Sequence, residues 1–208
     1  MTSPTSLLDV SPVIPVVTIS AVDHAVPVAR ALLAGGIPII ELTLRTGRAL
    51  EALATIAADV PDIVVGAGTV RTPQQADDAV ERGARFLVSP GASLRLLRHL
   101  VSLPVPVLPG VATASETLTA LDHGLTELKF FPAGPAGGPS YLSALAAPLP
   151  EARFCPTGGV TVDNMAEYLA LTNVPTVGGS WLTPARLLDS HDWAQITALA
   201  RDARSRAS

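Results

Sequence analysis

The sequence predicts an α/β fold built on a parallel sheet. Short apolar runs rich in β-branched residues recur along the chain, amphipathic stretches rich in Ala and Leu separate them, and the links between the two are short. Strands covered by helices on both faces are continuously apolar, which agrees with 48% hydrophobic and only 15% charged residues. Because eight strand–helix units favour a closed barrel over an open sheet, we expect a single (β/α)8 TIM barrel.

Strands and helices are expected to alternate along the whole chain. The eight strands are Val13–Ile19, Pro38–Thr43, Ile63–Ala67, Phe86–Val88, Val105–Leu108, Glu127–Phe130, Arg153–Pro156 and Pro175–Val177. The eight helices are Val26–Ala34, Ala49–Ala58, Pro73–Arg82, Ser93–Val101, Ala114–His123, Ser140–Ala146, Val162–Leu171 and Asp192–Arg204. Gly35–Gly36, Gly83 and Gly124 stand where helices would end, and Thr72–Pro73 is typical of a helix start.

The bulk properties bound the domain organisation and the partners. No linker divides the 208 residues, so we expect one domain over residues 1–208, with residues 1–10 as a flexible end. Met1–Val10 lacks the pattern of a secretory signal, and no run of about 18 uncharged apolar residues occurs. A net charge of −4 without a basic stripe argues against nucleic acid. The single cysteine, Cys155, cannot form an internal disulfide, so we expect a cytoplasmic location.

A carboxylate is expected inside the barrel on the second strand. Alternate strand residues point inward, and chemistry gathers at the carboxyl ends of barrel strands. This alternation places Glu41, Thr43 and Arg45 at the interior or its mouth. A carboxylate there is costly unless it is paired or used in catalysis. The alternative is a structural ion pair between Glu41 and Arg45.

The sixth strand carries the only lysine among 14 lysine and arginine residues. The same alternation turns Glu127, Lys129 and Phe131 inward. Arginine cannot give up its proton at useful pH, so it cannot replace lysine as a nucleophilic amine. An apolar site disfavours the ammonium form of lysine and so permits attack on a carbonyl. We therefore expect Lys129 to be a nucleophilic amine that attacks a carbonyl and forms a Schiff base; the alternative is a lysine that only pairs with a carboxylate.

Glycine pairs at the ends of the last two strands indicate a phosphate site. Thr157-Gly158-Gly159-Val160 follows the seventh strand, and Gly178-Gly179-Ser180-Trp181 follows the eighth and is expected to start a short extra helix. Many barrels bind phosphate here through backbone amides. The alternative is two tight turns without a ligand. The glycines of Val65–Thr69 and Val88–Gly91 are weaker signals that a ligand approaches the backbone.

Metal binding is not expected. His24, His99, His123 and His191 show no paired-ligand spacing and are expected to be surface or capping residues. Cys155 is expected to be a small core residue.

Taken together, the strand-end motifs resemble those of a known enzyme family. The motifs are Pro12-Val13-Ile14-Pro15-Val16, Ile40-Glu41-Leu42-Thr43-Leu44-Arg45-Thr46, Val65-Gly66-Ala67-Gly68-Thr69-Val70, Leu128-Lys129-Phe130-Phe131-Pro132-Ala133 and Pro156-Thr157-Gly158-Gly159-Val160. They resemble the bacterial 2-keto-3-deoxy-6-phosphogluconate (KDPG) aldolase / 4-hydroxy-2-oxoglutarate (KHG) aldolase family from Val13 to Pro184. The resemblance implies a class I aldolase that needs no metal or other cofactor, is cytoplasmic and is usually trimeric. It would act on a small 2-keto acid, with no nucleic-acid or membrane partner.

The resemblance also assigns roles to site residues. The Schiff-base lysine falls on Lys129 and the general acid/base on Glu41. The substrate contacts fall on Arg45 and Thr69 for the keto-acid carboxylate, Pro90 and Phe131 for the pyruvate pocket, and Gly158, Gly159 and Ser180 for phosphate, with Thr157 ahead of the glycines.

Three alternatives stay open at this point. One is a phosphate-binding barrel of another enzyme class, such as an isomerase or a thiamin-phosphate-synthase-like transferase, in which Lys129 only contacts an anion. Another is a non-catalytic phosphosugar-binding barrel. The third is the sister aldolase that cleaves the C4-epimeric galactonate, although Thr157 looks like the gluconate branch.

Overall fold

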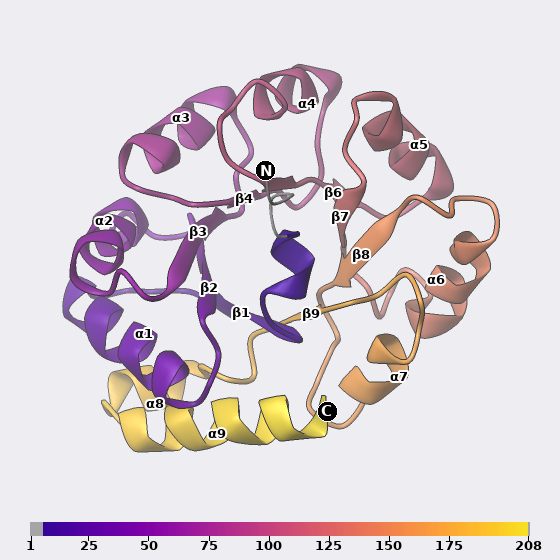
Figure 1. Ribbon diagram of the computed structural model, residues 1–208. Helices are drawn as coiled ribbons and strands as arrows, with labels where there is room; N and C mark the ends of the chain where they lie inside the picture. The colour runs from indigo at the N-terminus through magenta and orange to yellow at the C-terminus, as the bar shows by residue number, and fades with distance from the viewer. Residues whose placement is uncertain (1–5, 208) are drawn as a thin grey trace, which may run out of the picture.

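The computed structural model describes residues 6–207 as an α/β fold in which parallel strands curl around an axis and helices lie outside them (Figure 1). Nine strands are present in this part of the chain: β1 Val13–Val17, β2 Ile39–Thr43, β3 Val64–Gly68, β4 Leu87–Val88, β5 Val107–Leu108, β6 Gly110–Val111, β7 Glu127–Phe130, β8 Arg153–Pro156 and β9 Val177–Gly179. The α-helices are α1 Ala25–Ala34, α2 Ala49–Asp59, α3 Pro73–Glu81, α4 Leu94–Leu100, α5 Ala114–Asp122, α6 Gly138–Ala146, α7 Met165–Leu169, α8 Ala185–Asp189 and α9 Trp193–Arg206. Two short 3-10 turns, η1 Leu7–Asp9 and η2 Val22–His24, precede β1 and α1.

The strands form two parallel sheets. One has the order β5-β4-β3-β2-β1-β9 and the other the order β6-β7-β8. Glu41 pairs with Val16 of β1 on one side and with Gly66 of β3 on the other, and Lys129 of β7 pairs with Cys155 of β8. The expected α/β class is therefore confirmed, and each of the two inward charges lies on a central strand of its sheet.

Two expectations about strand ends were wrong. The expected fifth strand, Val105–Leu108, is shorter in the structure, where β5 covers Val107–Leu108, and a further short strand, β6, follows Pro109. Gly178 and Gly179 do not follow the last strand but belong to it, because their backbone pairs with Ile14 and Pro15 of β1. The short extra helix, α8, consequently begins only at Ala185.

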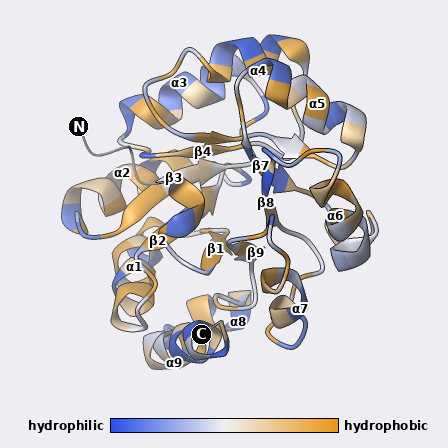
Figure 2. Ribbon diagram, turned by 45° about the vertical axis from the view of Figure 1, so that its right-hand side comes forward, coloured by the Kyte–Doolittle hydropathy of each residue, from blue (hydrophilic) through white to orange (hydrophobic). Residues whose placement is uncertain are grey.

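The core lies between the strands and the inner faces of the helices. Figure 2 shows predominantly apolar strands, with mixed apolar and polar colouring on the helices around them. The helix limits that glycine, threonine and proline predicted are confirmed. Thr72 caps α3 through its side chain, which accepts a hydrogen bond from the Gln75 amide, and Pro73 is the first helical residue. Gly36, Gly83 and Gly124 follow their helices with φ of +83°, +94° and +76°.

The amino-terminal segment differs from the flexible end that we expected over residues 1–10. Residues 1–5 lie outside the described part of the chain. Within the described part, Leu7 and Leu8 are buried in the core, and Arg153 of β8 binds Asp9, Glu127 and Ser6. Residues 6–10 are therefore packed against the strand ends.

His24 was expected at the surface or in a cap; it is the N-cap residue of α1, but its side chain is buried. Its Nε2 lies 3.1 Å from Nε2 of His191, and Trp193 packs edge-on against its ring with centroids 5.9 Å apart. A segment about 170 residues later in the chain covers this histidine, as the 167-residue separation of the pair shows.

Among residues 6–207, no helix is long and apolar enough to cross a membrane.

Candidate active site

The inward lysine and the inward glutamate contact each other. Nζ of Lys129 donates to Oε1 of Glu41 at 3.2 Å, and the two residues are only 5% and 3% exposed. They come from different sheets and are 88 residues apart in the chain. Glu41 therefore pairs with Lys129 and not with Arg45, which removes the structural ion pair considered from the sequence. Nζ also lies 5.4 Å from the centroid of the Phe131 ring, so an aromatic face borders the amine.

Glycines of β3 make room for this pair. A Cβ on Gly68 would lie 2.0 Å from Oε1 of Glu41, and a Cβ on Gly66 would lie 2.4 Å from the Phe86 ring. The sequence suggested that these glycines admit a ligand. Instead, they admit neighbouring side chains, and Gly68 lets the carboxylate lie against the backbone of the next strand.

The ends of β2 and β3 bring Arg45 and Thr69 together. Nε of Arg45 donates to Oγ1 of Thr69 at 3.3 Å. The amide of Leu44 donates to the Gly68 carbonyl at 2.8 Å, so the two strand ends stay bonded up to these residues. Thr69 has a φ of +61°, a left-handed conformation that is unusual for a β-branched residue and costs free energy. Arg45 is exposed, whereas Glu41 is buried, so the guanidinium lies nearer the mouth.

The backbone of Pro90 lies beside β6. A Cβ on Gly110 would come within 2.3 Å of the Pro90 carbonyl carbon, and Gly110 pairs with Lys129. Ser89, just before it, accepts a hydrogen bond from the Gly110 amide at 3.3 Å. These contacts place the end of β4 beside β6, and β6 in turn pairs with β7, the strand that carries Lys129.

A cavity of about 280 Å³ joins the remaining predicted residues. Its lining residues lie at the carboxyl ends of five strands, β1, β2, β7, β8 and β9. They are Val16, Thr18, Arg45, Phe131, Thr157, Gly158, Gly159, Val160, Gly178 and Ser180. Phe131 connects this cavity to the buried amine. The predicted carboxylate-binding arginine and the predicted phosphate loop therefore share one space, and the amine of Lys129 is linked to it through the ring of Phe131.

The two glycine pairs differ in what they do. Gly158 and Gly159 have φ of +90° and +85°, which turns the chain sharply after β8. Gly178 and Gly179 instead lie in a strand, and their missing side chains leave space for Thr157 and Trp181. Only the first pair has the turn geometry expected for a phosphate loop.

Sequence reasoning missed Thr18. It is exposed at the mouth of the cavity and lies 2.8 Å, hydroxyl to hydroxyl, from Thr43. Thr18 is the first residue after β1, so the rule that chemistry gathers at carboxyl ends of strands could have found it.

Cys155 lies under the site as expected for a core residue. Burial raises the pKa of its thiol to about 12. The thiol therefore stays protonated at neutral pH and is a poor nucleophile. Within residues 6–207, no three His, Cys, Asp or Glu side chains are grouped as metal ligands.

Known proteins are similar to this chain in sequence and in fold. The family described as "Aldolase: KDPG and KHG aldolase" matches residues 5–199. The chain belongs to the KDPG and KHG aldolase family. As a member, it is 50% identical to the 2-dehydro-3-deoxy-phosphogluconate aldolase of Dickeya dadantii and 48% identical to the KHG/KDPG aldolase of Escherichia coli K12. Each match covers 97% of this chain and 95% of the relative.

A solved KDPG aldolase also has this fold. The enzyme from Legionella pneumophila, with pyruvate captured as a covalent carbinolamine intermediate, superposes with a TM-score of 0.93 at 45% identity. The match covers 95% of this chain and 96% of that one. The family's members are aldolases, which are lyases, so the family excludes the non-catalytic barrel and the other enzyme classes that the sequence had left open.

Proposed function

We propose that this protein is a class I aldolase that cleaves KDPG to pyruvate and glyceraldehyde 3-phosphate, and KHG to pyruvate and glyoxylate. The observation that carries the proposal is the buried contact between Lys129 and Glu41, next to Phe131, which lines the cavity that contains Arg45 and the Gly158–Gly159 turn. An amine, a proton carrier, an anion-binding cation and a backbone turn are the parts that such a cleavage needs. The names of the relatives, and the covalent pyruvate adduct in the Legionella enzyme, support the same chemistry.

Lys129 supplies the electron sink. Its neutral Nζ attacks the C2 carbonyl of the keto acid and forms a carbinolamine, which loses water to give a protonated imine. When the C3–C4 bond breaks, its electron pair moves into this imine and forms an enamine. Protonation of the enamine at C3 and hydrolysis then release pyruvate and regenerate the amine.

Glu41 moves the protons of this sequence. Its carboxylate lies 3.2 Å from Nζ, within reach of the hydroxyl that forms on C2 and leaves as water. The same carboxylate then takes the proton of the C4 hydroxyl as the C3–C4 bond breaks, which turns C4 into the aldehyde carbon. It returns a proton to C3 of the enamine. The missing side chain of Gly68 leaves room for this carboxylate, because a Cβ there would lie 2.0 Å from its Oε1.

The other predicted residues orient the substrate. Arg45, with Thr69 bonded to it, holds the carboxylate next to C2. Pro90 and Phe131 border the pyruvate part. Gly158, Gly159 and Ser180 bind the phosphate at the far side of the same cavity, through backbone amides and a hydroxyl.

Reductive trapping tests the proposal. Pyruvate with borohydride should add one reduced pyruvate unit to a peptide that contains Lys129 and should abolish activity. Lys129→Arg keeps the charge but not the nucleophile, so it should be inactive and should trap nothing above the background from the terminal amine. Glu41→Gln should still trap pyruvate, while its turnover falls by at least about a hundredfold. Turnover by a folded Lys129→Arg protein would end the Schiff-base proposal.

The choice between the C4 epimers depends on residues that face C4. Thr157 is buried, lines the cavity and donates to the Cys155 carbonyl at 3.3 Å, so its hydroxyl is fixed beside the substrate. We propose the gluconate epimer as the preferred substrate, as the names of the relatives suggest. A coupled assay of pyruvate release from both epimers tests this choice.

We also propose that the two sheets are parts of one closed eight-stranded barrel, and that residues 1–208 form one domain. The chain passes directly from β5 to β6 across Pro109, whose carbonyl accepts the Lys129 amide at 3.0 Å. A single parallel bridge between Thr157 and Gly178 links β8 to β9. Both contacts support the proposal that the two sheets close into one barrel.

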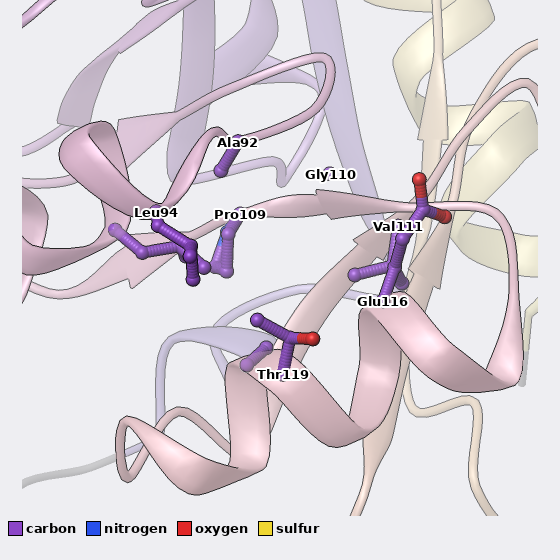
Figure 3. Close-up of a pocket in the computed structure, with 9 residues that line it drawn as sticks. Ala92, Leu94, Pro109, Gly110, Val111, Glu116 and Thr119 are labelled. Carbon is purple, nitrogen blue, oxygen red and sulfur yellow. The ribbon is translucent and has the colours of Figure 1, made fainter.

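A homotrimer, expected from the family resemblance, would need an apolar contact surface. The large hydrophobic residues that are most exposed within residues 6–207 lie on two adjacent helices, with Leu94 and Val101 on or next to α4 and Leu118 on α5. A pocket of about 130 Å³ lies between these helices, and Figure 3 shows Leu94 and Thr119 on opposite sides of it. We propose that α4 and α5 contact a second copy of this chain. A cytoplasmic location likewise stays an expectation from the resemblance.

A further inference from the structure

Two side chains pack onto opposite faces of the β9 backbone. A Cβ on Gly178 would lie 2.2 Å from Oγ1 of Thr157. A Cβ on Gly179 would lie 1.8 Å from Cζ3 of Trp181, 2.3 Å from Cε3 and 2.4 Å from Cη2. Successive residues of a strand face opposite sides, so Thr157 packs against one face of the strand and the six-membered ring of Trp181 packs against the other.

Strand β9 leads directly into Ser180. This serine lines the cavity together with Gly158 and Gly159, and its carbonyl accepts the Thr183 amide at 3.3 Å. Trp181 therefore sits in a tight turn and folds its ring back over the residue that precedes Ser180. Trp181 does not line the 280 Å³ cavity; it lines a neighbouring hollow that shares Ser180 with it.

We propose that Trp181 is a positioning residue that holds Ser180 at the correct distance from the Gly158–Gly159 turn, and so sets the affinity for the phosphate of the substrate. Thr157 provides the opposing contact and the backbone bridge to Gly178, so the two loops of the phosphate site are fixed to each other through one strand. This inference rests on the proposed function, because it assumes a phosphate at this end of the cavity.

Ring packing alone can be tested at this position. Nε1 of Trp181 is buried and has no hydrogen-bond partner among residues 6–207. Replacing the indole by phenylalanine therefore removes no hydrogen bond within the described chain and keeps an aromatic ring, although a smaller one, at this position. The chain also offers a matched control, because its other tryptophan, Trp193, packs against His24 and His191 and lines no part of the cavity.

The experiment compares KDPG with KHG, which has no phosphate. In Trp181→Ala, the KM for KDPG and the inhibition constant of inorganic phosphate should each rise about tenfold or more, which corresponds to about 1.4 kcal/mol of binding. The KM for KHG should stay within about twofold, and kcat should change little, because uniform binding of the phosphate is what is lost. Trp181→Phe should recover most of the loss, and Trp193→Ala should leave both substrates unchanged.

A double variant checks the contact itself. Gly179→Ala should damage the protein strongly, because its methyl group meets the indole, whereas Gly179→Ala combined with Trp181→Ala should be less harmful than the two changes added together. Additive effects would contradict the contact.

Two kinetic outcomes would overturn the inference. Equal losses on both substrates in Trp181→Ala would mean a general structural role, and unchanged kinetics in Trp181→Ala would mean no role. If the wild type shows no phosphate dependence at all, the phosphate site and this inference both fail. Trapping at Lys129 would still decide separately whether the protein is a Schiff-base aldolase.

Discussion

At the scale of single residues, Thr69 shows how the site is held under strain. Its left-handed backbone is the conformation that a β-branched side chain adopts least readily, yet its hydroxyl is the partner of Arg45. Such strain persists where the surroundings over-determine it, and it is typical of functional positions. The strained backbone of Thr69 therefore costs stability, while its hydroxyl fixes Arg45, the residue proposed to bind the substrate carboxylate.

We expect Thr69→Gly to be more stable and to bind the substrate less well. Relief of the backbone strain should exceed the entropic cost of glycine, so the free energy of unfolding should rise by about 1 kcal/mol. The KM of both KDPG and KHG should rise, because the hydroxyl that orients Arg45 is gone. Urea unfolding and steady-state kinetics measure the two effects. A less stable variant with unchanged KM would show that this reasoning is wrong; Thr69→Asn, which tolerates the left-handed region better, should lie between the two.

At the scale of elements, the amino-terminal turn η1 is tied to β7 and β8 through charge. Arg153 binds Asp9 and also lies 3.2 Å from Glu127. The hydrogen bond from Arg153 holds the pKa of Asp9 below its usual value. A lowered pKa stabilises the folded state at pH values above the unfolded-state pKa, and the contribution is lost as the pH falls through the folded-state pKa.

The predicted consequence is a pH-dependent effect of Asp9→Asn. At pH 7 the variant should be less stable than the wild type, by less than about 1 kcal/mol because the pair is partly exposed. The difference should shrink once the pH falls below about 3.9, the usual value for aspartate. Thermal unfolding at several pH values measures it. Asp62→Asn is the control, since this exposed aspartate has no ion-pair partner within residues 6–207; an equal effect of both variants would contradict the prediction.

At the scale of the whole molecule, the α4–α5 surface makes the oligomeric state testable. At micromolar concentration, sedimentation should give about three times the chain mass of 21.4 kDa. Leu94→Glu with Leu118→Glu should shift the protein toward the monomer, because charges replace apolar contacts at an interface. Gln195→Glu on the exposed side of α9 adds the same charge elsewhere and should leave the assembly intact. A wild type that sediments as a monomer would refute the trimer.

Strand alternation predicted the centre of the site well. Glu41 and Lys129 were placed inside from two strands read independently, and the structure has them in contact. Alternation works here because a buried strand fixes which face each residue takes. The place of Gly178–Gly179 in a strand and the burial of His24 were not predicted, because the surroundings of these residues come from elsewhere in the chain. Pairing with β1 made the glycines part of a strand, and His191 and Trp193 buried the histidine. No local pattern announces such distant partners.

The two ends of the chain depend on each other. β1 has β9 as one of its two neighbours, and side chains of α9 donate to carbonyls at the end of α1 and just after it: Thr197 to Ala31, Arg201 to Ala34 and Arg204 to Gly36. During synthesis at about 5–20 residues per second, one edge of the first strand would wait on the order of ten seconds for its partner. Until then that edge is an open template for other chains. Nascent copies on one messenger would therefore be exposed to aggregation through this edge until β9 has been made.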